Sequence, residues 1–130
     1  MPPAEASTTL LRILVVDDEP FVCESVKMLL AYDGHSVETA GGGVEALAKY
    51  DPTKFDLVIT DYSMGGMKGD QLAEAIKELS PSKPIILLTA FPPMEIPAGI
   101  DLVITKPFCF DTLRQGLAAM RAWRPMGERG

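Results

Sequence analysis

The sequence contains little cysteine, histidine and tryptophan, and it has no long uninterrupted apolar run. Of its 130 residues, two are cysteine, one is histidine and one is tryptophan. Two cysteines are too few for a disulfide framework, and no signal peptide opens the chain, so we expect a reducing, cytoplasmic setting. The longest mainly apolar stretch, residues 84–100, is interrupted by three prolines and Glu95. It is too short to span a bilayer, and we expect no membrane partner.

Basic charge is also scarce. The formal net charge is −6, and lysine and arginine form no cluster. A nucleic-acid groove or a surface for anionic lipids needs a basic patch, so the charge balance argues against nucleic-acid and membrane binding. The remaining partners are proteins and small ions. The length and the 47% hydrophobic content predict one compact domain over residues 10–123, with a flexible leader (1–9) and a flexible tail (124–130).

Apolar segments of two kinds alternate along the chain. Short segments of three to five residues, four of them rich in valine, isoleucine and leucine, predict strands, and longer segments with helical spacing lie between most of them. The predicted strands cover residues 13–16, 36–40, 57–60, 85–88 and 102–104, and the predicted helices cover 21–31, 44–50, 71–79 and 111–123. Continuously apolar strands indicate a sheet buried on both faces. The sequence therefore predicts an α/β, doubly wound fold with a five-stranded parallel sheet.

Polar residues follow four of the five predicted strands. They are Asp17 and Asp18 after the first strand, Asp61 after the third, Thr89 after the fourth, and Lys106 with Pro107 after the fifth. In a doubly wound sheet the carboxyl ends of the strands line the ligand crevice, so these side chains are expected to lie along one edge. Each alone would be an ordinary turn or cap residue, but together they suggest a site.

Carboxylates that crowd at one edge repel one another unless a positive charge lies among them. Oxygen ligands without histidine or cysteine favour a hard cation such as Mg²⁺. Lys106 would supply further positive charge. A hydrated cation, a hydroxyl and an ammonium suit the binding of a phosphoryl group, and one aspartate would act as its nucleophile.

The quoted motifs "VVDDEP", "DLVITDYSMGGMKGD", "IILLTAF" and "ITKPF" resemble, in order and spacing, the receiver domain of two-component response regulators. The resemblance covers about residues 12–120. It implies the flavodoxin-like strand order 2-1-3-4-5, and it implies that Asp61 accepts a phosphoryl group from a histidine kinase or a histidine phosphotransfer protein.

The same resemblance implies a role for the other residues at this edge. Asp18, Asp61 and the backbone carbonyl of Ser63 would bind Mg²⁺, and Asp17 would support the metal partly through water. Thr89 and Lys106 would contact the phosphoryl oxygens. The Lys106–Pro107 peptide bond is expected to be cis, as in the family.

The sequence departs from the family pattern in four places. Gly65 and Gly66 follow Met64 where the family usually has proline, which predicts a more flexible loop. Three prolines within residues 91–101 predict that the fourth helix is short or absent. Val103 replaces the aromatic residue that commonly couples to the threonine. Phe91 is hypothesised to shield the acyl phosphate, which Phe91→Ala would test through the phosphorylated lifetime.

Other residues with reactive side chains receive ordinary interpretations. Glu19 is interpreted as a charge at the start of a helix and not as a metal ligand. Cys23 and Cys109 are both interpreted as small buried hydrophobic residues.

Three functions are weighed. The first is a stand-alone, single-domain phosphoacceptor that forms a monomer or a weak dimer. It would act as a phosphate shuttle or sink, or it would bind an unknown downstream protein. A fragment of a hybrid kinase remains an alternative. It would catalyse only its own phosphorylation and dephosphorylation, so it is a switch and not an enzyme with a separate substrate. The second is a phosphorylation-independent interaction module with the same fold. The third, a flavin or nucleotide binder, lacks the expected glycine motifs.

Overall fold

The computed structural model describes residues 10–122, and the predicted leader (1–9) and tail (124–130) lie outside this range. The elements follow one another as β1 (Arg12–Val16), α2 (Pro20–Tyr32), β2 (Ser36–Ala40), α3 (Gly43–Lys49), β3 (Leu57–Thr60), α4 (Gly69–Leu79), β4 (Ile85–Thr89), β5 (Leu102–Thr105) and α5 (Phe110–Ala122). Each strand and helix lies within two residues of its predicted range.

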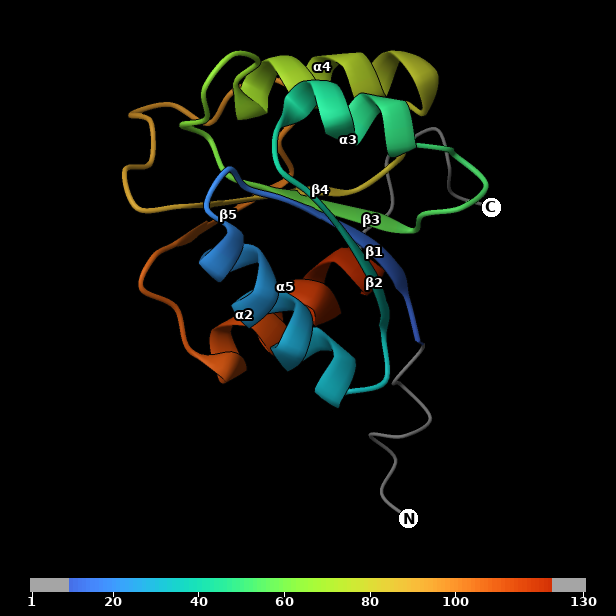
Figure 1. Cartoon of the computed structure of the whole chain (residues 1–130), viewed down its shortest axis with the longest axis vertical. Helices are drawn as coiled ribbons and strands as arrows, with labels where there is room; N and C mark the ends of the chain where they lie inside the picture. Colours follow the sequence, from blue (N-terminus) through green and yellow to red (C-terminus); the bar gives the residue numbers. More distant parts are fainter. Residues whose placement is uncertain (1–9, 123–130) are drawn as a thin grey trace.

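The five strands form one parallel sheet in the order β2-β1-β3-β4-β5. This confirms the predicted α/β class and the predicted strand order. Helices α3 and α4 cover one face of the sheet, and α2 and α5 cover the other (Figure 1). Because successive side chains of a strand point to opposite faces, Leu14 and Val16 pack under α3 and α4, whereas Ile13 and Val15 pack against α2 and α5.

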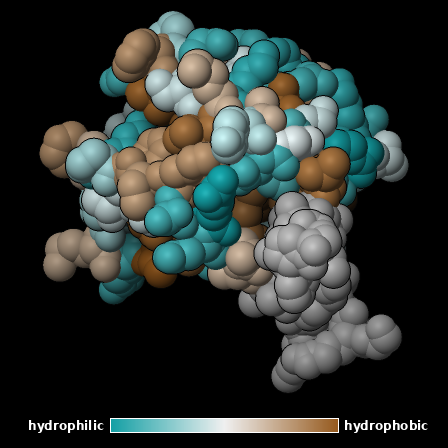
Figure 2. Space-filling model, turned by 90° about the horizontal axis from the view of Figure 1, so that it is seen from below, coloured by the Kyte–Doolittle hydropathy of each residue, from teal (hydrophilic) through white to brown (hydrophobic). Residues whose placement is uncertain are grey.

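The helices form where apolar residues recur at helical spacing behind a suitable first turn. Helix α2 has Pro20 at its first turn, where the missing amide is not needed. In α4, the Gln71 side chain accepts the Lys68 backbone N–H at 2.9 Å, and Leu72 and Ile76 are buried. Figure 2 shows the side of α2 and α5, where hydrophobic and hydrophilic residues are mixed at the surface. No helix within residues 10–122 is both long enough and apolar enough to cross a bilayer.

The crossover from β4 to β5 contains no helix, as its prolines predicted. Residues 90–101 form turns and bends that run outside the sheet (Figure 1, yellow to orange). Phe91, Met94 and Ile96 are exposed on this connection, and only Ile100 at its end is buried. The connection therefore needs an anchor other than an apolar helix face.

Asp101 provides this anchor with its backbone and its side chain. Its backbone N–H donates to the Ile85 carbonyl at 2.9 Å. Its Oδ2 accepts the Ile85 N–H and the Lys77 ammonium, each at 2.9 Å. The Asp101 side chain is 12% exposed, so these bonds are little weakened by solvent. One residue thus joins the end of the connection to β4 and α4.

Asp101→Ala should lower the free energy of unfolding by about 2–4 kcal/mol, because it removes a charged acceptor from two donors in a partly buried position. Urea denaturation followed by circular dichroism measures this loss. Glu95→Ala is the control, because Glu95 is exposed on the same connection and should change stability by less than about 0.5 kcal/mol. Equal stabilities of the two variants would contradict the anchoring role.

Candidate functional site

The carboxyl ends of β1, β3, β4 and β5 bring the polar residues of the site together. Asp17 follows β1, Asp61 follows β3, Thr89 ends β4, and Lys106 lies just after β5. Backbone hydrogen bonds join neighbouring strand ends, from Asp61 N–H to the Val16 carbonyl at 2.9 Å and from Lys106 N–H to the Thr89 carbonyl at 2.8 Å. The site is therefore built on strand ends that are hydrogen-bonded to one another.

Three carboxylates meet at this edge. Asp17, Asp18 and Asp61 each present an oxygen within 4.8 Å of the others. Asp17 is 3% exposed and Asp61 is 8% exposed, whereas Asp18 is exposed. Like charges at this separation, two of them out of water, raise the free energy of the folded protein unless cations offset them.

Lys106 supplies part of that offset. Its ammonium lies 2.9 Å from Asp17 Oδ2 and 3.8 Å from Asp61 Oδ2. Burial by itself lowers the pKa of Lys106, but the hydrogen bond and charge of Asp17, with the charge of Asp61, outweigh it and raise the pKa above its usual value. The ammonium is thus held in its charged form between two carboxylates.

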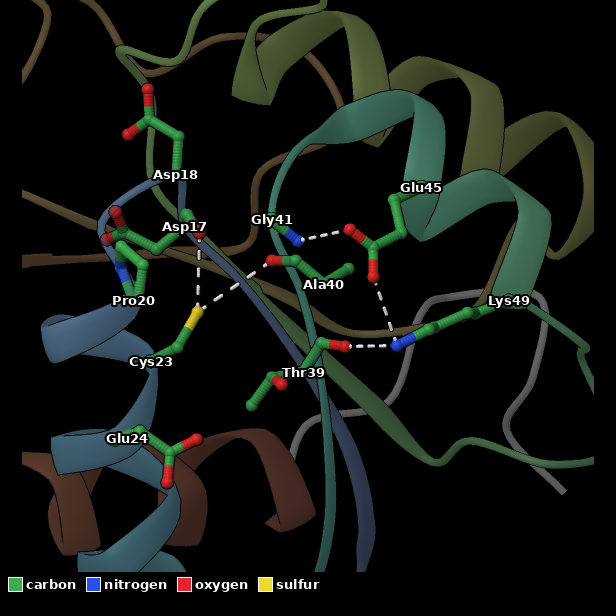
Figure 3. A pocket seen from close by; sticks show the side chains of 10 residues that line it. All are labelled: Asp17, Asp18, Pro20, Cys23, Glu24, Thr39, Ala40, Gly41, Glu45 and Lys49. Atoms are coloured by element: carbon green, nitrogen blue, oxygen red, sulfur yellow. Dashed lines mark hydrogen bonds and ion pairs between the residues drawn. The ribbon is translucent and has the colours of Figure 1, made fainter.

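The backbone and side chain of Asp17 are fully engaged. Its N–H donates to the Ala40 carbonyl at 3.1 Å, and its Oδ1 accepts the Glu19 N–H at 2.9 Å. The Cys23 thiol, which is buried, donates to the Asp17 carbonyl at 3.3 Å and lies 3.7 Å from the Ala40 carbonyl (Figure 3). Because the Lys106 ammonium contacts Oδ2, every polar group of Asp17 has a partner. Asp17 is therefore suited to hold the Lys106 ammonium and the start of the β1–α2 connection in position.

A cavity of about 230 Å³ adjoins this side of Asp17, between the β1–α2 and β2–α3 connections (Figure 3). Glu24 and Glu45 line it, and Lys49 forms an ion pair with Glu45 at 3.2 Å and donates to the Thr39 carbonyl. The single ammonium in its wall is thus engaged by protein groups.

Asp61 keeps part of its carboxylate available. Its Oδ1 accepts the Tyr62 N–H at 2.7 Å, and its Oδ2 has the longer contact with Lys106. Burial raises the pKa of Asp61, the Lys106 charge lowers it, and the Asp17 charge raises it, with a net upward shift. A hydrogen bond from the Thr89 side chain also lowers this pKa.

Asp18 and Ser63 lie at the exposed rim. Asp18 Oδ2 accepts the Gly65 N–H at 3.2 Å. The Ser63 side chain is exposed, and metal binding by its carbonyl stays a prediction. The residues present fit Mg²⁺, because the donors are all oxygens, and Asp18 and Asp61 each keep acceptor capacity beyond their single backbone amide.

Three residues with clear roles at the site did not follow from the sequence. Gly69 lies so close to Asp61 that a Cβ atom there would be 2.1 Å from the Asp61 carbonyl oxygen. Glu19 acts through its backbone N–H on Asp17, and Cys23 acts through its thiol. The glycine in "MKGD" was the one available signal, since a glycine at a helix start often marks close backbone approach.

The structure corrects one interpretation and confirms another. Cys109 is exposed and not buried, because it directly precedes α5 at the surface, whereas Cys23 is buried as predicted. The Lys106–Pro107 bond is cis, as expected. Phe91 is 79% exposed, and shielding of an acyl phosphate by its side chain stays a prediction about the phosphorylated state.

Comparisons with known proteins agree with the fold described above. The family model of the response regulator receiver domain matches residues 13–118. The probable transcriptional regulatory protein TcrX of Mycobacterium tuberculosis is 35% identical over 85% of this chain and 49% of TcrX. The transcriptional regulatory protein ZraR of Salmonella typhimurium is 38% identical over 82% of this chain and 25% of ZraR. The chain spans about half or less of the length of such relatives.

Two solved structures are similar over nearly their whole length. The chemotaxis protein CheY4 of Vibrio cholerae matches with a TM-score of 0.80 and 31% identity, over 86% of this chain and 99% of that one. The response regulator TrrA of Thermotoga maritima, solved in complex with Mg²⁺ and BeF, matches with a TM-score of 0.74 and 36% identity, over 84% and 97% of the two chains.

Asp61→Asn should raise the free energy of unfolding at pH 7 without metal, by roughly 0.5–2 kcal/mol, the usual gain when one unfavourable group is replaced. The pKa of Asp61 is raised in the folded state, so its destabilisation is absent below the unfolded pKa and fully present above the folded pKa. Urea denaturation at pH 7 with EDTA measures the difference.

Asp51→Asn is the matched control for this prediction. The pKa of Asp51 is lowered, first by a hydrogen bond from the Thr53 backbone N–H and second by one from the Thr53 side chain. The ionised form of Asp51 therefore stabilises the fold. The same change should therefore not stabilise the protein at Asp51. If Asp61→Asn were as stable as the wild type or less stable, crowding would not be the dominant effect at Asp61.

Proposed function

Because this chain belongs to the response regulator receiver domain family, we propose that it accepts a phosphoryl group on Asp61 from the phosphohistidine of a histidine kinase or a histidine phosphotransfer protein. One observation carries the proposal. Three carboxylates lie within 4.8 Å of one another, and the Lys106 ammonium lies 2.9 Å and 3.8 Å from two of them. Like charges held this close, two of them buried, raise the free energy of the folded protein, and a bound cation together with phosphoryl transfer would account for the arrangement.

The transfer uses the Asp61 carboxylate as the nucleophile. One Asp61 oxygen attacks the phosphorus atom, the P–N bond to the donor imidazole breaks, and the imidazole nitrogen leaves with the bond's electron pair. The Lys106 ammonium lies 3.8 Å from Asp61 Oδ2 and can donate to a phosphoryl oxygen there. The Thr89 hydroxyl would donate to another, so both groups stabilise charge that develops during transfer.

Mg²⁺ would be held by Asp18, Asp61 and the Ser63 carbonyl, with Asp17 acting partly through water. When bound, the ion offsets the negative charge of the phosphoryl oxygens and of the carboxylates. Asp17 cannot turn freely toward a ligand, since its carboxylate oxygens are engaged by the Glu19 N–H and by Lys106. Asp18, held by the single Gly65 N–H, is freer to do so.

In this proposal the protein is a cytoplasmic switch and not an enzyme with a separate substrate. Phosphorylation would alter its binding to a downstream protein, or it would act as a phosphate shuttle or sink, as a monomer or weak dimer. The proposal includes no nucleic-acid contact by this domain, since the chain carries a net charge of −6.

Two observations favour a second candidate, a phosphorylation-independent interaction module. Residues 90–101 lack a helix and expose Phe91, Met94 and Ile96. Val103 also replaces the aromatic residue expected of a switching receiver. An exposed apolar segment can bind a partner without any phosphorylation. This candidate does not explain why Asp17, Asp18 and Asp61 lie so close together.

Intact mass spectrometry after incubation with acetyl phosphate and Mg²⁺ tests the first candidate. The wild type should gain one phosphoryl group. Asp61→Asn should gain none because the nucleophilic oxygen pair is lost, and EDTA should prevent labelling because the carboxylates then lack their counter-ion.

Asp18→Asn supplies a graded control, since it keeps the nucleophile but removes a proposed metal ligand. It should label more slowly, with more Mg²⁺ needed for half-maximal rate. Labelling of Asp61→Asn at the wild-type rate, or no labelling of the wild type together with no beryllofluoride complex, would contradict the proposal and leave the interaction module.

A further inference from the structure

The connection between β3 and α4 contains Asp61 and Ser63, and the tip of this connection has little packed around it. Residues 62–68 lead from Asp61 to α4, and Gly65 and Gly66 lie at the tip of this connection. A Cβ atom built at either glycine would meet nothing within 4 Å, so the tip has open space around it. Even so, the Gly65 N–H reaches Asp18 Oδ2 at 3.2 Å. Something outside the tip must hold it in place.

Two methionines flank the tip and hold it to the rest of the protein. Met64 is only 3% exposed and belongs to the core under α3 and α4. Met67 is partly buried and packs against the same core. The methionines thus anchor the tip on both sides.

Met67 lies directly against Gly43, the buried first residue of α3. A Cβ atom at Gly43 would lie 2.7 Å from Met67 Cβ and 2.8 Å from its Cγ and Sδ. Such distances are shorter than real Cβ contacts, so only glycine fits there while the connection keeps its position. The start of α3 is thus packed directly onto the connection that carries the acceptor site.

We propose that Gly43 and Met67 are positioning residues for metal binding at the acceptor site. This inference rests on the proposed function. Their contact sets the distance between α3 and the β3–α4 connection, and thereby places the Gly65 N–H on Asp18 and the Ser63 carbonyl at the rim. Neither residue is a proposed metal ligand, so each would act through the backbone of residues 63–65.

The chain provides a matched pair of glycines for the test. Gly42 precedes Gly43, and a Cβ atom built there meets nothing within 4 Å. Its backbone is extended, so alanine is tolerated there. Gly43→Ala should push the connection away from α3, whereas Gly42→Ala should leave it in place. The Mg²⁺ dissociation constants of both variants are measured by isothermal titration calorimetry.

Gly43→Ala should raise the Mg²⁺ dissociation constant about tenfold, the lower end of the effect of removing a group that supports metal ligands. Gly42→Ala should bind like the wild type. Gly43→Ala adds a methyl group to a crowded position and can impair folding. Met67→Ala therefore gives a second test, because it removes the anchoring atoms beyond Cβ without adding any. Met67→Leu should restore wild-type affinity, because leucine fills a similar volume.

Unfolding free energies are measured in parallel, since a purely structural contact would change stability and leave the Mg²⁺ affinity of the folded protein unchanged. Wild-type Mg²⁺ affinity in either Gly43→Ala or Met67→Ala would overturn this inference and leave the proposed function intact. A wild-type protein that bound no Mg²⁺ would instead overturn the proposed function, and the inference with it.

Discussion

Repulsion among three carboxylates at one edge of a parallel sheet is the constraint on which the rest of the site depends. Asp17 and Asp61 are nearly removed from water, and Asp18 lies beside them. The single ammonium of Lys106 contacts two of the three. One positive charge against three negative charges leaves the cluster short of cations, which makes a divalent ion the natural complement. The folded protein carries this unfavourable charge because the sheet beneath it is stable enough to hold it.

The architecture explains how the chain holds like charges together. Parallel strands end at the same edge, and backbone hydrogen bonds between neighbouring ends fix Asp61 beside Val16 and Lys106 beside Thr89. Apolar layers on both faces keep the strands in place. By contrast, the β4–β5 crossover is held by the hydrogen bonds of Asp101 and exposes apolar side chains. The fold therefore combines an acceptor edge held by backbone hydrogen bonds with a crossover that exposes apolar side chains.

Much of this arrangement could be predicted from the sequence, because it depends on local patterns. Runs of valine, isoleucine and leucine located four of the five strands, and the polar residues that follow them located Asp17, Asp61 and Lys106. The prolines of residues 91–101 correctly predicted a crossover without a helix.

Other features depend on approaches between segments distant in sequence, which periodicity does not encode. The contact of Met67 with Gly43, the bond from Gly65 to Asp18 and the thiol of Cys23 under Asp17 all belong to this class. The prediction that Cys109 is buried was wrong for a related reason. The residue type alone does not show that Cys109 lies at the surface before α5.

A crystal structure of the protein grown with Mg²⁺ and beryllofluoride tests the central claim most directly. The account predicts beryllium bonded to an Asp61 oxygen, Mg²⁺ between Asp18 and Asp61, and the Lys106 and Thr89 side chains in contact with fluorine atoms. Such a structure would also show whether the Gly65 amide stays on Asp18. Beryllofluoride bound elsewhere, or an Asp61 carboxylate that binds neither it nor Mg²⁺ under these conditions, would contradict the account.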